Sequence, residues 1–445
     1  MKRRSGFYLV SLGCPKNLVD SEGIAALLQR AGLPPAASPE RAEVLIVNTC
    51  GFIAPARAES LAALRELAAA KRPGQVLIAA GCYAERCPEE LAQALPGIDG
   101  LIGTRRWPAI VGLVERLRAA RSAQPLPLRA PCEANDAAQE IHGLPRAAVQ
   151  DGSAYLKLAD GCSRACAFCA IPLIKGPAVS RPPEAIIADA RWLAQRGVQE
   201  IVLIAQDTTA YGQDLGLRDG LNGLLERLVQ AVPEVPWLRL MYAFPGPAVE
   251  RLDEAMARHP QLLRYLDLPL QHAHPDVLRR MRRPHDMDAV CRSLARLRAA
   301  LPDIALRTTF LVGYPGETEA EFEALLEFVE ESAFDHVGVF MYSHEAGTPA
   351  ASLPDDVPVA VKEERRNRLM ALQQPISLAR NRLFVGRTLD VLIEGQDSGL
   401  SVGRSYRDAP EIDGLVLVQG VLPVGRIVPV RITSALEYDL IGEPA

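Results

Sequence analysis

The sequence has no long apolar run, no excess of basic charge and few cysteines, and each absence excludes a class of protein. No segment approaches the roughly 18 apolar residues that a membrane-spanning helix needs. With 49 basic and 54 acidic residues the net charge is −5, so the bulk charge does not indicate a nucleic-acid-binding protein. Nine cysteines in 445 residues are too few for a disulfide scaffold.

The remaining composition is typical of a folded protein with several domains. Apolar residues make up 49% and charged residues 23%, which excludes a largely disordered chain. At about 100 to 200 residues per domain, the length predicts two to four domains. Basic residues and a short apolar stretch before Cys14 imitate a lipoprotein signal, but polar residues follow at once. We therefore expect a cytoplasmic protein whose cysteines serve metals or catalysis.

Residues 5–119 alternate short apolar runs with longer helix-like stretches. The expected strands are 7–12, 44–48, 76–80 and, more weakly, 100–102, and the expected helices are 18–31, 54–71 and 88–95. This alternation predicts a parallel sheet built from βαβ units. The polar, proline-rich stretch that follows predicts a linker, assigned to residues 120–147.

Residues 148–378 resume the alternation, with apolar strands that end near 158, 205, 243, 268, 312 and 342. Six βα units fit either a doubly wound sheet or a partial (β/α) barrel, and periodicity alone does not distinguish them. Residues 381–445 then contain β-branched runs separated by Gly, Asp and Pro, which predicts a small all-β barrel or sandwich. From residue 385 onward there are five arginines, no lysine and nine acidic residues, a net charge of −4.

Cys162, Cys166 and Cys169 form a C-x3-C-x2-C pattern in the segment DGCSRACAFCAIP. Zinc sites usually draw four ligands from two separated pairs, and no second pair follows at the distance typical of zinc fingers. Three thiolates leave one metal corner free, which suits a [4Fe–4S] cluster with an open iron. The alternative is three buried, inert thiols.

Cys14, Cys50 and Cys82 are far apart in sequence, yet each directly follows an expected strand, in LVSLGC, LIVNTC and LIAAGC. The ends of such strands gather around one crevice in an open α/β sheet, so we expect a second set of three ligands there. Taken singly, each cysteine would more often be a small buried apolar residue, but the repetition argues against that interpretation. No such arrangement marks the other three, which are expected to be structural: Cys87, Cys132 and Cys291.

CSRACAFC carries the C-x3-C-x-aromatic-C signature of radical S-adenosylmethionine enzymes. Together with the upstream cysteines and the C-terminal β module, it makes the whole chain resemble the methylthiotransferase family. The resemblance implies an α/β fold with an N-terminal parallel-sheet cluster domain, a radical SAM partial (β/α)6 barrel and a TRAM-like β-barrel. The branch that modifies the twelfth small-subunit ribosomal protein is most similar in SLGCPKNLVDSE, CAFCAIPLIKG, AQDTTAYG, LPLQHAHPDVLRRMRR and GRSYRDAPEIDG.

The resemblance also implies two [4Fe–4S] clusters, S-adenosylmethionine and an electron donor. The cluster on Cys162, Cys166 and Cys169 would bind S-adenosylmethionine, and one electron would then yield a 5′-deoxyadenosyl radical. That radical would abstract hydrogen from the β-carbon of a target aspartate. The cluster on the three N-terminal cysteines would present a sulfur or methylthio group to the carbon radical, and a second S-adenosylmethionine would supply the methyl group.

Further cofactor contacts are predicted around the barrel strands. Gly313, Gly316 and Glu317 follow the fifth strand, where glycine allows close contact with an adenosine. The family pattern G-x-I-x-G-x-x-E is not met residue for residue, and an ordinary strand-to-helix turn explains them equally well. Gln206 and Asp207, after the second strand, either face the cofactor or cap the next element.

Two histidines, His272 and His274, lie in a predicted strand-to-helix loop. A metal site is conceivable, but we expect them to form hydrogen bonds instead.

Charge distinguishes between the two substrates known for this family. A module that binds RNA normally needs clustered lysine and arginine, whereas this acidic, lysine-free module suits a basic ribosomal protein. We therefore expect the twelfth small-subunit ribosomal protein, free or in the ribosome, as substrate, with no direct transfer-RNA partner and no membrane partner. The alternatives are a transfer-RNA adenosine (position 2) methylthiotransferase and a non-enzymatic iron–sulfur or zinc protein, and the acidic surface could also lack any partner.

Overall fold

The computed structural model describes residues 6–120, 127–130, 139–141 and 143–445. These residues form two compact units. The first contains the chain up to residue 148 together with residues 157–164 and 169–185, and the second contains residues 149–156, 165–168 and 186–445. The segment around the C-x3-C-x2-C pattern is therefore shared between the units.

The first unit is built on a five-stranded parallel sheet with strand order β1-β2-β3-β4-β5. Its strands are β1 (Phe7–Ser11), β2 (Val44–Thr49), β3 (Val76–Gly81), β4 (Gly100–Gly103) and β5 (Leu128–Arg129). Its helices are α1 (Pro15–Arg30), α2 (Ala54–Ala70), α3 (Cys82–Arg86), α4 (Pro88–Ala94) and α5 (Ile110–Ala119). The predicted parallel sheet is confirmed, and β5 adds a fifth strand from within the segment predicted as a linker.

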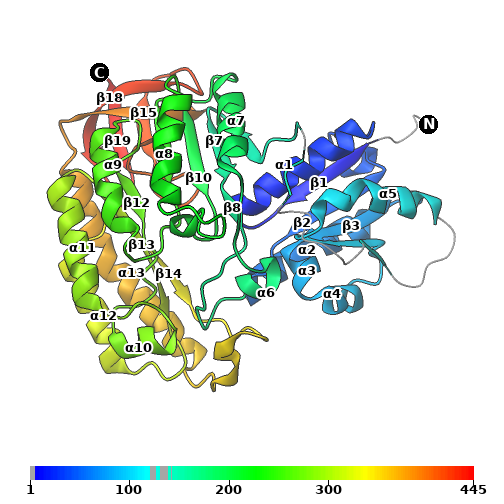
Figure 1. Ribbon diagram of the computed structural model, residues 1–445, viewed down its shortest axis with the longest axis horizontal. Helices are drawn as coiled ribbons and strands as arrows, with labels where there is room; N and C mark the ends of the chain where they lie inside the picture. Colours follow the sequence, from blue (N-terminus) through cyan, green and yellow to red (C-terminus); the bar gives the residue numbers. More distant parts are fainter. Residues whose placement is uncertain (1–5, 121–126, 131–138, 142) are drawn as a thin grey trace. The chain divides into compact units, whose positions relative to one another are not determined.

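Helices cover both faces of this sheet (Figure 1). Successive strand side chains point to opposite faces, so Ile46 packs in the core formed with α1 and α5, whereas Leu45 and Val47 pack with α2, α3 and α4. Strands buried on both faces have continuous apolar sequences. This explains why β2 and β3 are buried throughout and why their sequences do not alternate.

Short elements complete the first unit near the cysteine motif. An antiparallel pair is formed by β8 (Ala159–Asp160) and β9 (Val179–Ser180), and α6 (Ile171–Lys175) lies between them in the sequence. Strand β6 (Ala147–Gln150) passes from the first unit into the second, and β7 (Ser153–Lys157) belongs to the second unit except for Lys157, which belongs to the first.

The second unit contains six βα steps that form the predicted partial barrel. Its strands after β7 are β10 (Glu200–Ile204), β11 (Trp237–Leu240), β12 (Tyr265–Asp267), β13 (Ala305–Val312) and β14 (His336–Met341). They form sheets of order β11-β10-β7-β6 and β12-β13-β14, and a parallel bridge between Leu238 and Leu262 connects the two. The helices are α7 (Pro183–Ala194), α8 (Gly220–Ala231), α9 (Leu252–Arg258), α10 (Pro275–Arg280), α11 (Met287–Ala300), α12 (Glu319–Ser332) and α13 (Val359–Arg382). Figure 1 shows α8, α9, α11 and α12 outside these strands.

The C-terminal residues form a closed barrel with strand order β15-β16-β17-β19-β18. Its strands are β15 (Thr388–Asp397), β16 (Leu400–Ser405), β17 (Val416–Gln419), β18 (Ile427–Ala435) and β19 (Leu440–Pro444). The predicted small all-β barrel is thus confirmed. Among the described residues, no helix combines the length and the hydropathy needed to cross a bilayer.

Candidate cluster sites

The three N-terminal cysteines lie at the carboxyl ends of neighbouring strands. Cys14 is the N-cap of α1, three residues after β1; Cys50 directly follows β2; and Cys82 opens α3 directly after β3. Thr49 and Gly81 are register partners in the parallel pair β2–β3, so the chain leaves both strands at the same level. The sheet therefore delivers all three thiols to one edge, as the sequence pattern predicted.

Glycine makes the close approach of these loops possible. Gly13 has a φ of +91°, and a Cβ at this position would lie 2.8 Å from Cys50 Cβ and 3.1 Å from its Sγ. Gly51 likewise has no room for a side chain, because a Cβ there would lie 2.6 Å from Tyr83 Cα. The loops that carry Cys14, Cys50 and Cys82 thus contact one another through backbone and sulfur.

Replacing Gly13 with alanine is expected to separate the Cys14 and Cys50 loops, because Cys50 would have to shift and the positive φ disfavours any side chain. We expect the anaerobically reconstituted variant to lose the iron held by this cysteine set, measured as iron per polypeptide. Gly97→Ala is the matched control, since no atom lies within 4 Å of a Cβ at that exposed position. Full iron content in Gly13→Ala would contradict this prediction.

Burial favours the protonated form of two thiols in this set, so a bound cation would have to displace their protons. Burial raises the pKa of the Cys50 thiol, and it raises the pKa of Cys82 to about 12. The Cys14 sulfur contributes to both increases, and the Lys175 ammonium opposes the increase at Cys82. Three soft sulfur donors in mutual electrostatic reach are the ligand type that iron–sulfur clusters require.

Two asparagines that sequence analysis missed support the strand ends. The Asn17 amide donates to the carbonyl of Leu12 (2.6 Å) and to that of Asn48 (3.2 Å). The Asn48 amide in turn donates to the Asn17 carbonyl at 2.9 Å. Each asparagine lies within three residues of a predicted ligand cysteine, which is the sequence signal that could have identified them. They fix the Cys14 and Cys50 loops through reciprocal hydrogen bonds.

Five buried charged residues in the same unit form a network that we call the buried ion cluster. Its members are Asp20 on α1, Arg146, Lys157 on β7, Asp160 on β8 and Lys175 on α6. Both carboxylates contact all three cations; Asp20 lies 2.9 Å from Lys175 and 3.2 Å from Arg146, and it also pairs with Lys157. Asp160 lies 3.0 Å from Arg146, 3.1 Å from Lys175 and 3.2 Å from Lys157.

The buried ion cluster joins the segment after Cys14 to the segment before Cys162 within this unit. Burial raises the pKa of Asp20, but the surrounding cations, Lys157 and Lys175 foremost, outweigh it and hold the pKa below its usual value. Asp20 is six residues after Cys14, and Asp160 is two residues before Cys162. Nothing in the periodicity marked these residues, because a buried charge is identified by its partners and not by its local sequence.

The C-x3-C-x2-C segment starts from a tight turn. Gly161 has a φ of +79°, and a Cβ there would lie 2.0 Å from the Pro177 carbonyl oxygen. The Cys162 amide donates to the Gly176 carbonyl at 3.1 Å, and the Arg164 amide approaches Cys162 Sγ at 3.4 Å. Cys162 and Cys169 belong to the first unit and Cys166 to the second, so the grouping of these three sulfurs stays a prediction from their spacing.

Gln206 and Asp207 follow the barrel strand β10. The Gln206 side chain is half-buried, and its Oε1 has no hydrogen-bond partner among the described residues. Asp207 accepts a hydrogen bond from the Ala210 amide at 3.2 Å and so caps the next turn, the second of its predicted roles. A side-chain oxygen without a hydrogen-bond partner, two residues after a strand, is available to bind a ligand. Gln206 therefore stays a predicted cofactor residue.

The glycine-containing turn after β13 is held by its own hydrogen bonding and by contacts with residues 356–365. Gly313 has a φ of +71°, and a Cβ there would lie 2.3 Å from Lys362 Cγ. The buried Glu317 carboxylate accepts a hydrogen bond from the Tyr314 amide at 3.2 Å and pairs with Arg365 at 2.9 Å. The Gly316 amide donates to Asp356 at 2.8 Å. These contacts match the strand-to-helix turn, and direct cofactor contact by these residues stays a prediction.

The remaining predicted polar residues form ordinary contacts. His272 Nδ1 accepts from the His274 amide at 2.9 Å, and His274 Nδ1 accepts from the Asp276 amide at 3.3 Å, so both make hydrogen bonds as expected. Burial lowers the pKa of His272 to about 3. Cys87 is half-buried and Cys291 is exposed, whereas Cys132 lies outside the described residues.

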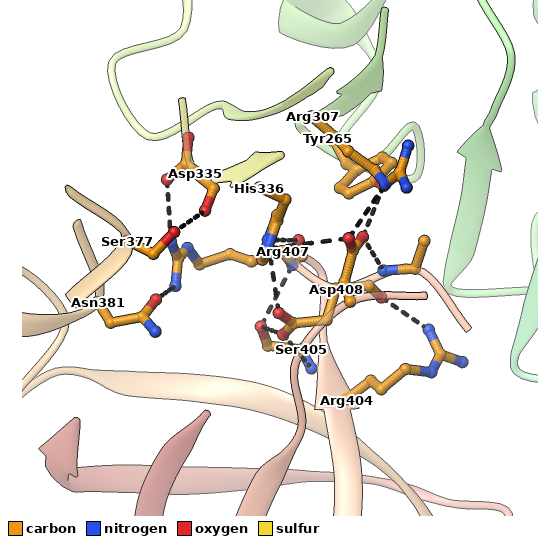
Figure 2. A network of polar contacts seen from close by, with 12 residues as sticks. Tyr265, Arg307, Asp335, His336, Ser377, Asn381, Arg404, Ser405, Arg407 and Asp408 are labelled. Atoms are coloured by element: carbon orange, nitrogen blue, oxygen red, sulfur yellow. Dashed lines mark hydrogen bonds and ion pairs between the residues drawn. The ribbon is translucent and has the colours of Figure 1, made fainter. Parts of the chain in front are cut away.

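A dense charged network joins the C-terminal barrel to the partial barrel within the second unit (Figure 2). Arg407 pairs with Asp335 at 2.9 Å and donates to the Asn381 amide oxygen at 2.8 Å. Asp413 accepts from the Tyr265 hydroxyl at 2.7 Å and from Arg307 at 3.2 Å. The residues between β16 and β17 are thus fixed in the core, and the C-terminal barrel is an integral part of this unit.

Comparisons with known proteins agree with these features. The Radical SAM superfamily matches residues 156–329, Uncharacterized protein family UPF0004 matches residues 6–103 and the TRAM domain matches residues 385–444. A Chloroflexus aurantiacus protein named ribosomal protein uS12 methylthiotransferase RimO is 53% identical over 453 residues, covering 98% of this chain and 99% of the relative. The chain belongs to the ribosomal protein uS12 methylthiotransferase family. It is a radical S-adenosylmethionine methylthiotransferase.

Other relatives support the same assignment, and a solved structure shares the fold. Proteins of the same name from a Roseiflexus species and from a Synechocystis species are 53% and 45% identical, each over 98% of this chain and 96% of the relative. The solved structure of the radical S-adenosylmethionine methyltransferase TsrM from Kitasatospora setae, with cobalamin and a [4Fe-4S] cluster bound, matches with a TM-score of 0.55. At 14% identity, over 78% of this chain and 74% of that one, this match confirms the fold of the methylthiotransferase.

Proposed function

We propose that this methylthiotransferase transfers a methylthio group to the β-carbon of an aspartate in the small-subunit ribosomal protein uS12. The observation that carries the proposal is the similarity, over 98% of this chain, to a relative named as a methylthiotransferase of that ribosomal protein. The second set of three cysteines, which the N-terminal sheet brings to one edge, supports it. Forming the radical needs one iron–sulfur cluster. A second set of three cysteines can hold another cluster, which would supply the sulfur.

The donor sets fit two [4Fe–4S] clusters. Cys14, Cys50 and Cys82 would hold one cluster, and Cys162, Cys166 and Cys169 the other, each with one open iron. When bound, the cluster on Cys162, Cys166 and Cys169 supplies the electron that cleaves S-adenosylmethionine and starts the radical chemistry. Gly13 and Gly51 allow the loops that carry the N-terminal cysteines to lie close together. The buried ion cluster fixes α1, which follows Cys14, and β8, which precedes Cys162.

The surface charge of the C-terminal barrel supports a protein substrate. Arg404 and Arg407 are buried in it, as are the side chains of Asp408 and Asp413, and Glu394 pairs with Arg404 at 2.6 Å. Seven acidic side chains and three arginines remain at least partly accessible, so the accessible surface keeps its acidic sign. Such a surface attracts a basic protein and repels the phosphates of RNA.

The proposal assigns the remaining partners by their chemistry. A low-potential electron donor must reduce the cluster, and a second S-adenosylmethionine provides the methyl group. The substrate is ribosomal protein uS12, free or in the ribosome, with no transfer RNA bound directly. A ribosomal-protein substrate places the enzyme in the cytoplasm.

An anaerobic assay with purified components tests the proposal. The reconstituted enzyme is incubated with S-adenosylmethionine, dithionite and sulfide, and with either recombinant uS12 or unmodified transfer RNA. We expect a methylthio group on one aspartate of uS12, located by tandem mass spectrometry, and none on the RNA. Methylthiolated adenosine with unmodified uS12 would favour the transfer-RNA alternative.

A further inference from the structure

The backbone beside Cys166 is fixed by the second unit. The Ala167 amide donates to the Met281 carbonyl at 2.9 Å, and the Ala167 carbonyl accepts from the Ala350 amide at 2.8 Å. Ala167 and Met281 also pack in one apolar cluster with Tyr314 and Tyr342. The residue next to Cys166 is therefore held against the C-terminal end of α10.

The end of α10 has a backbone turn that directs Arg283 inward. The Arg283 amide donates to the Leu278 carbonyl at 2.8 Å and the Arg282 amide to the Arg279 carbonyl at 3.0 Å, the two bonds of a Schellman motif. Arg282 occupies the left-handed position with a φ of +55°, where glycine is usual. A non-glycine residue in this region costs on the order of 1 kcal/mol, so the surrounding packing imposes the turn.

Arg283 makes three contacts from this turn. Its Nη1 lies 3.7 Å from Cys166 Sγ, within the range of an N–H···S hydrogen bond. Its Nη2 donates to the Pro269 carbonyl, and its guanidinium carbon lies 4.1 Å from the centre of the Phe244 ring. The side chain is only 7% exposed. A permanently charged group is thus buried with one N–H donor directed at a predicted ligand sulfur.

We propose that Arg283 is a positioning residue that raises the reduction potential of the radical SAM cluster. This inference rests on the proposed function, in which Cys166 is a ligand of that cluster. One-electron reduction adds a negative charge that is shared with the ligand sulfurs. A buried cation that donates a hydrogen bond to one of those sulfurs stabilises the reduced state more than the oxidised state. Arg283 therefore makes the electron transfer that precedes cofactor cleavage more favourable.

The test compares Arg283→Gln and Arg283→Lys in the full-length chain. Cys14, Cys50 and Cys82 are replaced by alanine in every protein, so that a single cluster contributes to the signal. Arg279→Gln is the matched control, because Arg279 lies on α10 just before the turn that carries Arg283, and its loss changes the formal charge equally. Unlike Arg283, it is exposed and pairs with Asp276. The midpoint potential is measured by redox titration with electron paramagnetic resonance, and iron per polypeptide is measured in parallel.

We expect Arg283→Gln to make reduction about tenfold less favourable, a fall of ~59 mV for a one-electron couple. Arg283→Lys keeps the charge, so its midpoint potential is expected to fall by less. The potential of Arg279→Gln should match that of the parent protein. An unchanged potential in Arg283→Gln would overturn the inference. If Arg283→Gln retains no iron, the potential of Arg283→Lys tests the inference. A purely structural role predicts a lower iron content in Arg283→Lys with an unchanged potential in the molecules that hold iron. Failure of the parent protein to bind iron would instead count against the proposed function.

Discussion

Replacing Cys166 with alanine is expected to abolish reductive cleavage of S-adenosylmethionine, a fall of more than about a thousandfold, because the ligand set acts as a unit. Replacing Cys14 with alanine should leave that cleavage in place and abolish methylthio transfer, since Cys14 belongs to the other cysteine set. The measurement is 5′-deoxyadenosine formed after anaerobic reconstitution and dithionite reduction, with transfer to uS12 followed in the same samples.

The matched control is Cys291→Ala, which removes an exposed thiol on α11 and should alter neither product. Formation of 5′-deoxyadenosine by the parent enzyme excludes the non-enzymatic iron–sulfur or zinc alternative. If Cys14→Ala abolished cleavage while Cys166→Ala did not, the two cysteine sets would have been assigned the wrong way round.

The second large effect is expected on stability, from Asp20→Asn. The wild-type buried ion cluster contains three cations and two carboxylates, and this substitution leaves Asp160 as the one carboxylate of the cluster. Removing one partner from a buried ionic group typically costs about 3–5 kcal/mol of unfolding free energy. Urea denaturation of the protein without bound iron measures the loss of unfolding free energy, with Glu43→Gln as the control. Glu43 pairs with Arg118 at a half-exposed site, where an ion pair contributes little.

The pH dependence of this difference follows from the lowered pKa of Asp20. A carboxyl whose pKa is lower in the folded state stabilises the protein above its unfolded pKa of ~3.9, and this stability is lost as the pH falls through the folded value. Asparagine imitates the protonated carboxyl. The difference between wild type and Asp20→Asn should therefore be constant above about pH 4 and shrink below it, and a difference that grows on acidification would contradict the assigned role.

The N-terminal cysteine site was predictable because the sequence repeats one local pattern three times. An apolar run followed by a cysteine places each thiol at a strand end, and parallel strands bring their ends to one edge; Thr49 and Gly81 in register confirm this for Cys50 and Cys82. The supports of the site were not predictable in this way. Asp20 and Lys175 are 155 positions apart, and only the folded chain shows that they meet.

The fold shows the same division between local and long-range signals. Helices and strands with long periodic sequences were predicted near their observed positions, whereas β5, only two residues long, lay in a segment predicted as a linker. Its pairing with β4 depends on the sheet edge and not on its own sequence. The partner of Glu317 could not be predicted from its local sequence. Glu317 forms a buried ion pair with Arg365 on α13, a helix that the local motif does not include.

The mass of uS12 in cells with and without this gene tests the central claim most directly. The account predicts that uS12 carries one methylthio group when the gene is present, that fragmentation places it on an aspartate, and that the group disappears on deletion and returns with the wild-type gene but not with Cys166→Ala. An unchanged uS12 mass on deletion, accompanied by loss of a methylthio group from a transfer-RNA adenosine, would contradict the account.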